Sequence, residues 1–281
     1  MLIKKNHRIR LLVFDLDNTA LGGYTPYHRF PGRFVCFLNE LKHLNIQWAT
    51  CTTWGVDLQF SMVQYSGVKN PPVFLSGSSG LDLMKVINWK LEPDAEHARR
   101  IKRLSENMRK RNWPVIKTII SELLKKDWIC EFEFNFQNIL SLRARSDRIK
   151  SVRDYVNGKI DGKQYYEFDP NNKSFAILLP FYMNKGMAVE TMQRRLGIGP
   201  DETLVAGDGC NDLSMMALAK WVVCPANAAE EVKKAVSAAG GIIGSRKYSD
   251  GVVEAIRKLM KFRKRKTFNA QHSTSNVQGL R

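Results

Sequence analysis

Two carboxylates separated by one residue follow an apolar run near the start of the chain. The run Leu11-Leu12-Val13-Phe14 leads directly into Asp15-Leu16-Asp17-Asn18-Thr19. A continuous apolar stretch is typical of a buried parallel strand, and open α/β sheets place their ligands at the carboxyl ends of strands. Two carboxylates this close repel each other unless a cation, a proton or a phosphoryl reaction requires them. Alone, the pattern equally fits a polar strand end before a helix cap.

A second acidic segment lies far downstream, after another short apolar strand at residues 203–206. It reads Gly207-Asp208-Gly209-Cys210-Asn211-Asp212. The glycines permit a tight turn, and Asn211 or Asp212 can cap the helix that follows. An ordinary strand–turn–helix junction explains those features, but it does not explain three acids and an amide at one sheet edge. Asp15, Asp208 and Asp212 would form an all-oxygen pocket, which suits Mg²⁺.

A lysine and two threonines complete the set of candidate residues. Lys185 stands at the start of an expected helix over residues 186–196, where the helix dipole disfavours a cation, and this hints at a ligand. The expected strand Ile46–Thr50 runs into Thr50-Cys51-Thr52, whose hydroxyls can donate hydrogen bonds to phosphate oxygens. A threonine-rich strand end is also common from β propensity alone.

Taken in chain order, the four segments resemble the four motifs of the haloacid dehalogenase superfamily of phosphohydrolases. Those motifs are Asp-x-Asp-x-Thr, a Thr or Ser at a strand end, a Lys, and Gly-Asp-x-x-Asn-Asp. The stretch from Lys185 to Asp212 is especially similar to the branch of Cof-type sugar phosphatases and sucrose-phosphate phosphatases, subfamily IIB. The resemblance covers about residues 9–260. The usual Thr-Gly-Arg is Thr50-Cys51-Thr52 here, so the phosphate-binding hydroxyl is either Thr50 or Thr52, and position favours Thr50.

The resemblance also implies a role for each residue. Asp15 would be the nucleophile that becomes an aspartyl phosphate, and Asp17 would be the general acid and base. The Asp15 carboxylate, the Asp17 main-chain carbonyl and Asp208 would hold Mg²⁺, with Asp212 acting through the metal's waters. The expected phosphate-binding residues are Thr50, Lys185 and Asn211, with Asn211 orienting its loop.

Alternating strands and helices predict an α/β fold with a Rossmann-like, doubly wound parallel sheet. The expected strands are Leu11–Asp15, Ile46–Thr50, Val73–Ser76, Thr203–Ala206 and Trp221–Cys224. The expected helices are Arg33–Leu44, Val56–Tyr65, Gly186–Leu196, Ser214–Ala219 and Ala228–Ala238.

An insertion interrupts this series, and we place it at residues 83–183. Two charged helices are expected there, at 93–112 and 114–126, because Pro114 should separate them. Strand-like pieces follow at 130–136, 139–143, 165–168 and 175–179, with a strong turn at 169–172. In the resembled branch such an α+β unit is a C2-type cap. The predicted organisation is a core of residues 1–82 and 184–262, a cap of residues 83–183, and a basic tail of residues 263–281 expected to be disordered.

Composition agrees with an enzyme that has a sizeable core and no membrane segment. Of the 281 residues, 44% are hydrophobic, and there is no long uncharged apolar run. The N-terminus does not resemble a secretory signal, and the 5 scattered cysteines favour the reducing cytoplasm. The net charge of +17 raises the question of nucleic acid. However, the basic runs at 99–103 and 109–111 read as a solvated helix face without interleaved aromatic residues.

These observations predict a Mg²⁺-dependent phosphatase that acts on a small phosphorylated substrate, with sugar phosphates as the leading class by resemblance. The aromatic and imidazole side chains expected to line the entrance, if they do not simply pack, are Tyr24, Tyr27, His28 and Trp54. One alternative is a phosphomutase of the same fold, which would return the phosphoryl group to the sugar. A weaker one is a basic, nucleic-acid-associated protein on a hydrolase platform, supported only by the charge.

Overall fold

The computed structural model describes residues 9–22, 29–145, 147–160, 166–168 and 175–260. Contacts divide the chain into two units, and the inserted unit spans Ala95–Met183. The core unit comprises the chain up to Asp94 and from Asn184 onward. The expected tail at 263–281 and the expected turn at 169–172 lie outside the described residues.

The core unit contains one sheet, with the strand order β12-β11-β10-β1-β2-β3-β4-β5. The strands are β1 (Leu11–Phe14), β2 (Gln47–Cys51), β3 (Phe74–Gly77), β4 (Asp82–Ile87), β5 (Lys90–Pro93), β10 (Thr203–Ala206), β11 (Trp221–Cys224) and β12 (Ile242–Ile243). Pairing is parallel from β12 to β3 and antiparallel for β4 and β5. β1 is central, and the chain winds outward from it in both directions. The predicted doubly wound fold is therefore confirmed.

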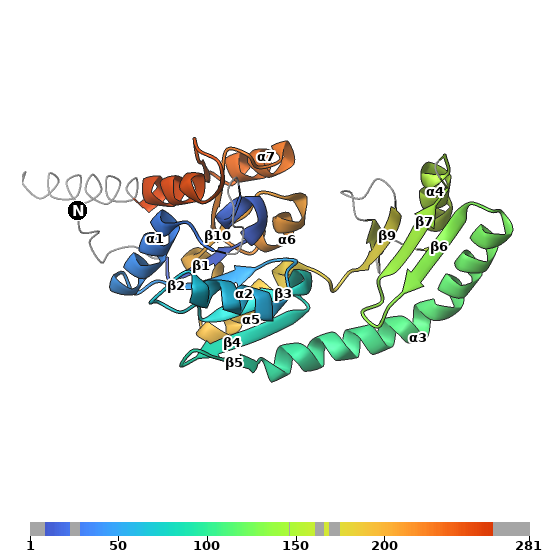
Figure 1. The fold of residues 1–281 in the computed structure, drawn as a ribbon, viewed down its shortest axis with the longest axis horizontal. Coiled ribbons are helices and arrows are strands. Elements are labelled where there is room, and N and C mark those ends of the chain that lie inside the picture. The colour runs from blue at the N-terminus through green and yellow to red at the C-terminus, as the bar shows by residue number, and fades with distance from the viewer. Residues whose placement is uncertain (1–8, 23–28, 146, 161–165, 169–174, 261–281) are drawn as a thin grey trace, which may run out of the picture. The chain divides into compact units, whose positions relative to one another are not determined.

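Helices cover both faces of this sheet, because each central strand is apolar on both sides. The side chains of Leu12 and Phe14 join one buried cluster, and those of Leu11 and Val13 join the other. The first cluster includes residues of α1 (Gly32–His43), α2 (Val56–Tyr65) and the helix at 248–260. The second includes residues of α5 (Lys185–Leu196), α6 (Leu213–Met216) and α7 (Glu230–Ala238). Figure 1 shows these helices around the strands of the core.

The first boundary between the units lies after Asp94 instead of after residue 82. The β4–β5 hairpin pairs with β3, so that Phe74 faces Lys85 and Gly77 faces Asp82, and it extends the core sheet. Asp94 is fully buried, and it accepts hydrogen bonds from Arg195 at 2.8 and 3.1 Å and pairs with Lys85 at 3.3 Å. The hairpin was missed because its exposed, charged strands lack the apolar signal of a core strand.

The inserted unit packs two helices against an antiparallel sheet of order β6-β7-β9-β8 (Figure 1). Its strands are β6 (Ile129–Phe134), β7 (Leu140–Ala144), β8 (Tyr166–Phe168) and β9 (Phe175–Pro180), and its helices are α3 (Ala95–Lys125) and α4 (Ile149–Lys159). The predicted pair of helices is wrong, because α3 runs unbroken through Pro114. Buried side chains on both sides of the proline, from Met108 to Leu123, hold the helix together. The sequence reading also missed α4.

Among the described residues, no helix is both long and apolar enough to cross a bilayer. All five cysteines are free.

Candidate active site

The structure brings the two acidic segments together at the carboxyl edge of the core sheet. β1 and β10 are neighbours, with Phe14 facing Ala206, and the Asp15 amide donates a hydrogen bond to the Ala206 carbonyl at 2.9 Å. Asp15 and Asp208 therefore leave adjacent strands in the same direction. Carboxylate oxygens of Asp15, Asp208 and Asp212 all lie within 4.8 Å of one another. The three carboxylates that were expected to form an all-oxygen pocket therefore lie together.

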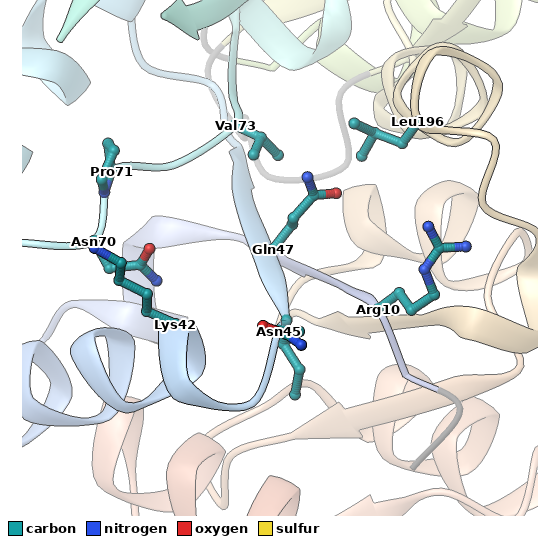
Figure 2. Close-up of a pocket in the computed structure, with 9 residues that line it drawn as sticks. Arg10, Lys42, Asn45, Gln47, Asn70, Pro71, Val73 and Leu196 are labelled. Atoms are coloured by element: carbon teal, nitrogen blue, oxygen red, sulfur yellow. The ribbon is translucent and has the colours of Figure 1, made fainter. Parts of the chain in front are cut away.

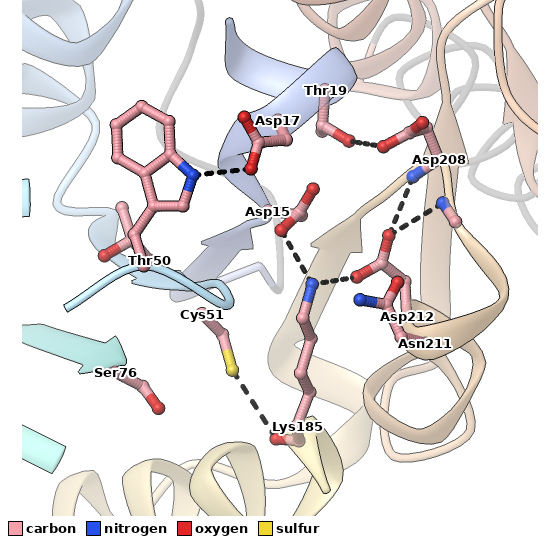
Figure 3. Close-up of polar contacts among 12 residues, drawn as sticks. Asp15, Asp17, Thr19, Thr50, Cys51, Ser76, Lys185, Asp208, Asn211 and Asp212 are labelled. Atoms are coloured by element: carbon pink, nitrogen blue, oxygen red, sulfur yellow. Dashed lines mark hydrogen bonds and ion pairs between the residues drawn. The ribbon is translucent and has the colours of Figure 1, made fainter. Parts of the chain in front are cut away.

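Lys185 occupies the centre of this group and is only 1% exposed. Its ammonium donates hydrogen bonds to Asp15 Oδ1 at 2.7 Å and to Asp212 Oδ1 at 2.5 Å (Figure 3). Asn184 caps α5 by accepting a hydrogen bond from the Gly186 amide at 2.8 Å, and this fixes the turn that delivers the lysine. The unfavourable position of a cation at a helix start is thus compensated by two buried carboxylates.

Asp212 is held by the backbone of its own loop. Its Oδ2 accepts hydrogen bonds from the amides of Asp208 at 2.9 Å and Gly209 at 3.0 Å. A Cβ atom at Gly207 would lie 2.5 Å from Asp212 Oδ2, so only glycine leaves room for this carboxylate. Asp212 thus serves both as an acceptor for Lys185 and as the organiser of the loop that presents Asp208.

The loop after β1 forms a π-type turn at Leu16–Ala20, in which the Leu21 amide bonds to the Leu16 carbonyl. Asn18 adopts a left-handed conformation there, with φ of 54°. The Thr19 hydroxyl donates to Asp208 Oδ1 at 2.8 Å, and the Asn227 amide donates to the Asn18 carbonyl at 2.8 Å. The contact of Thr19 joins the first motif to the fourth, and the sequence reading assigned no role to Asn227.

Asp17 is half-buried, and its Oδ2 accepts a hydrogen bond from the Trp54 indole N–H at 2.6 Å (Figure 3). Trp54 follows β2 and was one of the residues expected near the site entrance. The indole fixes one oxygen of Asp17 and leaves the carboxylate at the edge of the acidic cluster. Tyr24, Tyr27 and His28 lie outside the described residues.

The two threonine candidates have different surroundings. Thr50 is buried in β2, and its hydroxyl donates to Gln59 Oε1 at 2.6 Å and points away from Asp15 (Figure 3). The Gln59 amide nitrogen in turn donates to the carbonyls of Trp54 and Ser76. Thr52 lies just beyond the strand, is fully buried, and its hydroxyl has no hydrogen-bond partner within the described part of the chain. A buried hydroxyl without a partner is rare and requires an explanation.

Burial dominates the electrostatics of the cluster. It raises the pKa of the Asp15 carboxyl to about 7, because desolvation, together with Asp212 and Asp208, outweighs the attraction of Lys185. It likewise raises the pKa of Asp208 to about 6, despite the hydrogen bond from Thr19. Burial opposes the charge of Lys185, but Asp15 and Asp212 hold the pKa of its ammonium above the ordinary value. Three carboxylates thus face one ammonium, and the site has excess negative charge to be neutralised.

The donor set fits a hard divalent cation. Asp15 and Asp208 each use one carboxylate oxygen in a hydrogen bond between described residues, which leaves the second oxygen for a ligand. Asn211 and Cys210 are exposed on the same loop. The structure therefore places Lys185 in contact with Asp15 and Asp212, with Asp208 within 4.8 Å of both carboxylates, and it places Asn211 at the surface.

One pocket of the core unit lies elsewhere, at the amino ends of β1, β2 and β3 (Figure 2). This hollow of about 460 Å³ is lined by Arg10, Lys42, Asn45, Ile46, Gln47, Asn70, Pro71, Val73 and Leu196. Arg10 pairs there with Glu202 at 3.3 Å. The pocket contains no predicted site residue, because the acidic cluster lies at the opposite ends of the same strands.

Comparison with known proteins agrees with this geometry. Residues 96–256 match the family model of haloacid dehalogenase-like hydrolases. A stretch of 79 residues is 38% identical to the chloroplastic endoribonuclease YBEY of Arabidopsis thaliana, over 28% of this chain and 13% of that protein. A stretch of 86 residues is 36% identical to a phosphoglycolate phosphatase of Thermoplasma volcanium, over 27% of this chain and 38% of that one. The chain thus spans less than half the length of these curated relatives.

A solved structure shows the same fold over nearly the whole chain. The sucrose-phosphatase of Synechocystis sp. PCC6803, in complex with sucrose and phosphate, superposes with a TM-score of 0.62 at 19% identity, over 90% of this chain and 98% of that one. The family model covers more than half of the chain and includes Lys185, Asp208 and Asp212. The predicted family is confirmed, and the chain belongs to the haloacid dehalogenase-like hydrolases.

Proposed function

We propose that this chain is a Mg²⁺-dependent phosphatase that hydrolyses a small phosphate monoester, with a sugar phosphate as its substrate class. One observation carries the proposal. Three carboxylates and one fully buried lysine, drawn from three separate segments, converge where β1 and β10 end. A protein that only binds a ligand would not need to bury three carboxylates side by side, since burying carboxylates that lack a cationic partner costs free energy.

The residues that would hold Mg²⁺ are the carboxylates of Asp15 and Asp208 and the main-chain carbonyl of Asp17, with Asp212 behind them. The cation would offset the negative charge of both the site and the phosphate. It would also keep Asp15 ionised at neutral pH, where the carboxyl of the metal-free protein, with a pKa of about 7, is half protonated.

Asp15 would act as the nucleophile. The Asp15 carboxylate oxygen that does not bind the cation attacks phosphorus in line, the bond from phosphorus to the ester oxygen breaks, and an aspartyl phosphate forms. Asp17 gives a proton to the departing alkoxide, then removes one from the water that cleaves the acyl phosphate. The Trp54 indole N–H, 2.6 Å from Asp17 Oδ2, would hold the carboxylate in a fixed orientation for both transfers.

Lys185 and Thr52 would bind the transferring phosphoryl oxygens. Lys185 is already at the nucleophile, 2.7 Å from Asp15 Oδ1. We assign the hydroxyl to Thr52 instead of Thr50, because the Thr50 hydroxyl is engaged by Gln59 whereas the buried Thr52 hydroxyl lacks a partner in the described structure. A bound phosphate oxygen would supply that partner. Asn211 would orient its loop, as the resemblance suggests.

The comparisons support the proposed substrate class. The phosphoglycolate phosphatase relative acts, by its name, on a small phosphate ester. The sucrose-phosphatase whose fold this chain shares was solved with sucrose and phosphate. Both agree with a small phosphorylated substrate, and the second favours a sugar.

The test is a panel of sugar phosphates, polyol phosphates and nucleotides, assayed for phosphate release with Mg²⁺ and with EDTA. We expect release that requires Mg²⁺ and is abolished in Asp15→Asn. Undiminished turnover in that variant would refute the proposed nucleophile. Product analysis with a hexose bisphosphate separates the phosphomutase alternative, since a mutase would yield an isomeric sugar phosphate in place of free phosphate.

A further inference from the structure

The inserted unit carries exposed aromatic side chains on the basic helix α3 and on the neighbouring strand β6 and its turn. Trp113 of α3 is 41% exposed, Phe132 of β6 is 48% exposed, and Phe136, in the turn after β6, is 92% exposed. Large aromatic side chains usually bury most of their surface. Several of them exposed together mark a binding surface more often than chance.

Three aromatic side chains and two cations form one cluster, here called the aromatic–basic cluster and composed of Arg109, Trp113, Lys117, Phe134 and Phe136. Phe132 lies two residues from Phe134 on the same face of β6. The Trp113 and Phe134 rings stack, with centroids 5.3 Å apart and planes at 14°. The Arg109 guanidinium lies 5.0 Å from the Phe134 ring and 5.7 Å from the Phe136 ring. The Lys117 ammonium lies 6.0 Å from the Trp113 ring.

The turn that presents Phe136 is fixed, although the ring itself is exposed. Arg109 donates hydrogen bonds to the Asn135 carbonyl at 2.7 Å and to Asn138 Oδ1 at 3.2 Å. The fully buried Asn138 donates from Nδ2 to the Ser105 hydroxyl at 2.9 Å and to the Tyr182 hydroxyl at 2.7 Å. These hydrogen bonds attach the turn to α3 and to Tyr182, which follows β9. The backbone that carries the exposed Phe136 ring is therefore held in place.

The charge around the cluster is positive. Lys110 and Lys117 are exposed on α3 beside the aromatic rings. The nearest strand acids, Glu131 and Glu133, alternate with Phe132 and Phe134 along β6, so their side chains project to the other face of the sheet. The sequence reading found no aromatic residues interleaved with the basic run of α3. The fold supplies them from a strand some twenty residues further along the chain.

We propose that the aromatic–basic cluster binds single-stranded nucleic acid, an activity separate from the phosphatase site. Planar rings supported by cations are the combination that such binders use, since bases stack on the rings and phosphates pair with the cations. Charge complementarity favours this partner, because the chain carries a net charge of +17. A lipid surface fits less well, because the exposed rings project from a fixed turn and not from one apolar helix face.

The test is fluorescence anisotropy of the full-length protein with labelled oligo(U) RNA and oligo(dT) DNA of about 12 nucleotides. We expect binding that weakens steeply between about 50 and 200 mM salt. Phe136→Ala should weaken it at least about fivefold, and Trp113→Ala should do the same. Tyr65→Ala is the matched control, because Tyr65 is 76% exposed on the core unit, and it should leave affinity unchanged.

A second variant separates stacking from charge. Lys110→Gln with Lys117→Gln should lower the slope of log affinity against log salt by about 1.4, since each phosphate contact contributes roughly 0.7 for a single strand. A protein that binds neither oligonucleotide at low salt overturns the proposal. So does one that binds equally well after both aromatic truncations, with an unchanged circular dichroism spectrum. Binding of only one of RNA and DNA would support the cluster and identify the ligand.

Discussion

Asp15→Asn should stabilise the metal-free protein near neutral pH while it abolishes turnover. Asp15 is 5% exposed, and burial raises the pKa of its carboxyl from 3.8 to about 7. A carboxyl whose pKa is higher in the folded state favours folding while it is protonated there. Its contribution is fully present below pH 3.8, and it is lost as pH rises through about 7. Asparagine has the same shape and does not ionise, so the variant does not lose stability as pH rises through this range.

The size of the effect follows from the shift. A rise of about three pKa units corresponds to about 4 kcal/mol between the two ends of that pH range. This is an upper bound, because the structure around a buried carboxylate can relax. For a chain of this size, 1 kcal/mol moves the melting temperature by about 3 °C. In EDTA, the melting temperature of the variant should therefore rise relative to that of the wild type by up to about 10 °C as pH increases from about 4 to 8.

The assay is thermal or denaturant unfolding of both proteins in EDTA across this pH range, followed by the same series with Mg²⁺. Mg²⁺ should narrow the difference in melting temperature between the two proteins, because only the wild type retains the full set of carboxylate ligands. A ligand at a hundred times its dissociation constant adds about 2.7 kcal/mol to the free energy of unfolding. Asp154→Asn is the matched control, since Asp154 is exposed on α4 and its loss should leave the curve unchanged.

Parallel pH dependences for the wild type and Asp15→Asn in EDTA would refute the reasoning. That result would mean that the Asp15 carboxyl is not desolvated in the folded protein. It would leave the proposed reaction open, because nucleophilic attack by Asp15 is tested separately by turnover.

Four further changes test the rest of the site. Thr52→Val should lower kcat/KM about a hundredfold at unchanged stability, since it removes a hydroxyl that lacks a partner in the ligand-free protein. Thr50→Val should keep activity and cost about 1–3 kcal/mol of unfolding free energy, because a buried amide oxygen loses its donor. Trp54→Phe removes the N–H that orients Asp17 and should lower kcat about tenfold for alkyl phosphates and less for an aryl phosphate, whose leaving group needs no proton. Gly207→Ala should impair both activity and stability, by about 1–3 kcal/mol, because its Cβ would meet a carboxylate at 2.5 Å.

Each of these has a contradicting outcome. Full activity in Thr52→Val, with a loss in Thr50→Val, would return the phosphate contact to Thr50. An equal loss for alkyl and aryl phosphates in Trp54→Phe would assign the indole to packing. Gly199→Ala is the control for Gly207, because a Cβ at Gly199 would meet no atom within 4 Å. Equal effects at the two glycines would show that the contact with Asp212 does not matter.

The sequence predicted the core sheet well because its strands carry a strong physical signal. β10 and β11 were predicted to the residue, since continuous apolar runs bounded by turn residues have few other interpretations. The meeting of Asp15 with Asp208 and Lys185 was expected from the resemblance of the four motifs, because the sequence alone does not give the order of the strands. The parallel pairing of β1 with β10 explains why the two acidic segments meet, since neighbouring parallel strands end at the same edge.

The remainder depends on tertiary contacts that leave little local trace. β4 and β5 have mixed, exposed side chains, and only their pairing with β3 makes them strands. Pro114 should end a helix by its local chemistry, yet buried residues on both sides keep α3 continuous. The choice between Thr50 and Thr52 depends on Gln59, because its side-chain oxygen accepts the hydrogen bond of the Thr50 hydroxyl. The sequence does not show where the Gln59 side chain lies, so this contact could not be predicted.

The second boundary between the units lies two residues before Lys185, the lysine of the candidate active site. The inserted unit ends at Met183, Asn184 caps α5, and Lys185 follows immediately. On the other side, Asp94 is anchored by Arg195 and Lys85 just before α3 begins. A force applied at the connection between Asp94 and Ala95 would act on the ion pair of the buried Asp94 carboxylate. A force applied at the connection between Met183 and Asn184 would act only two peptide bonds from Lys185, whose ammonium contacts Asp15. Mechanical load on the inserted unit would be transmitted through a single asparagine cap to a lysine that is only 1% exposed.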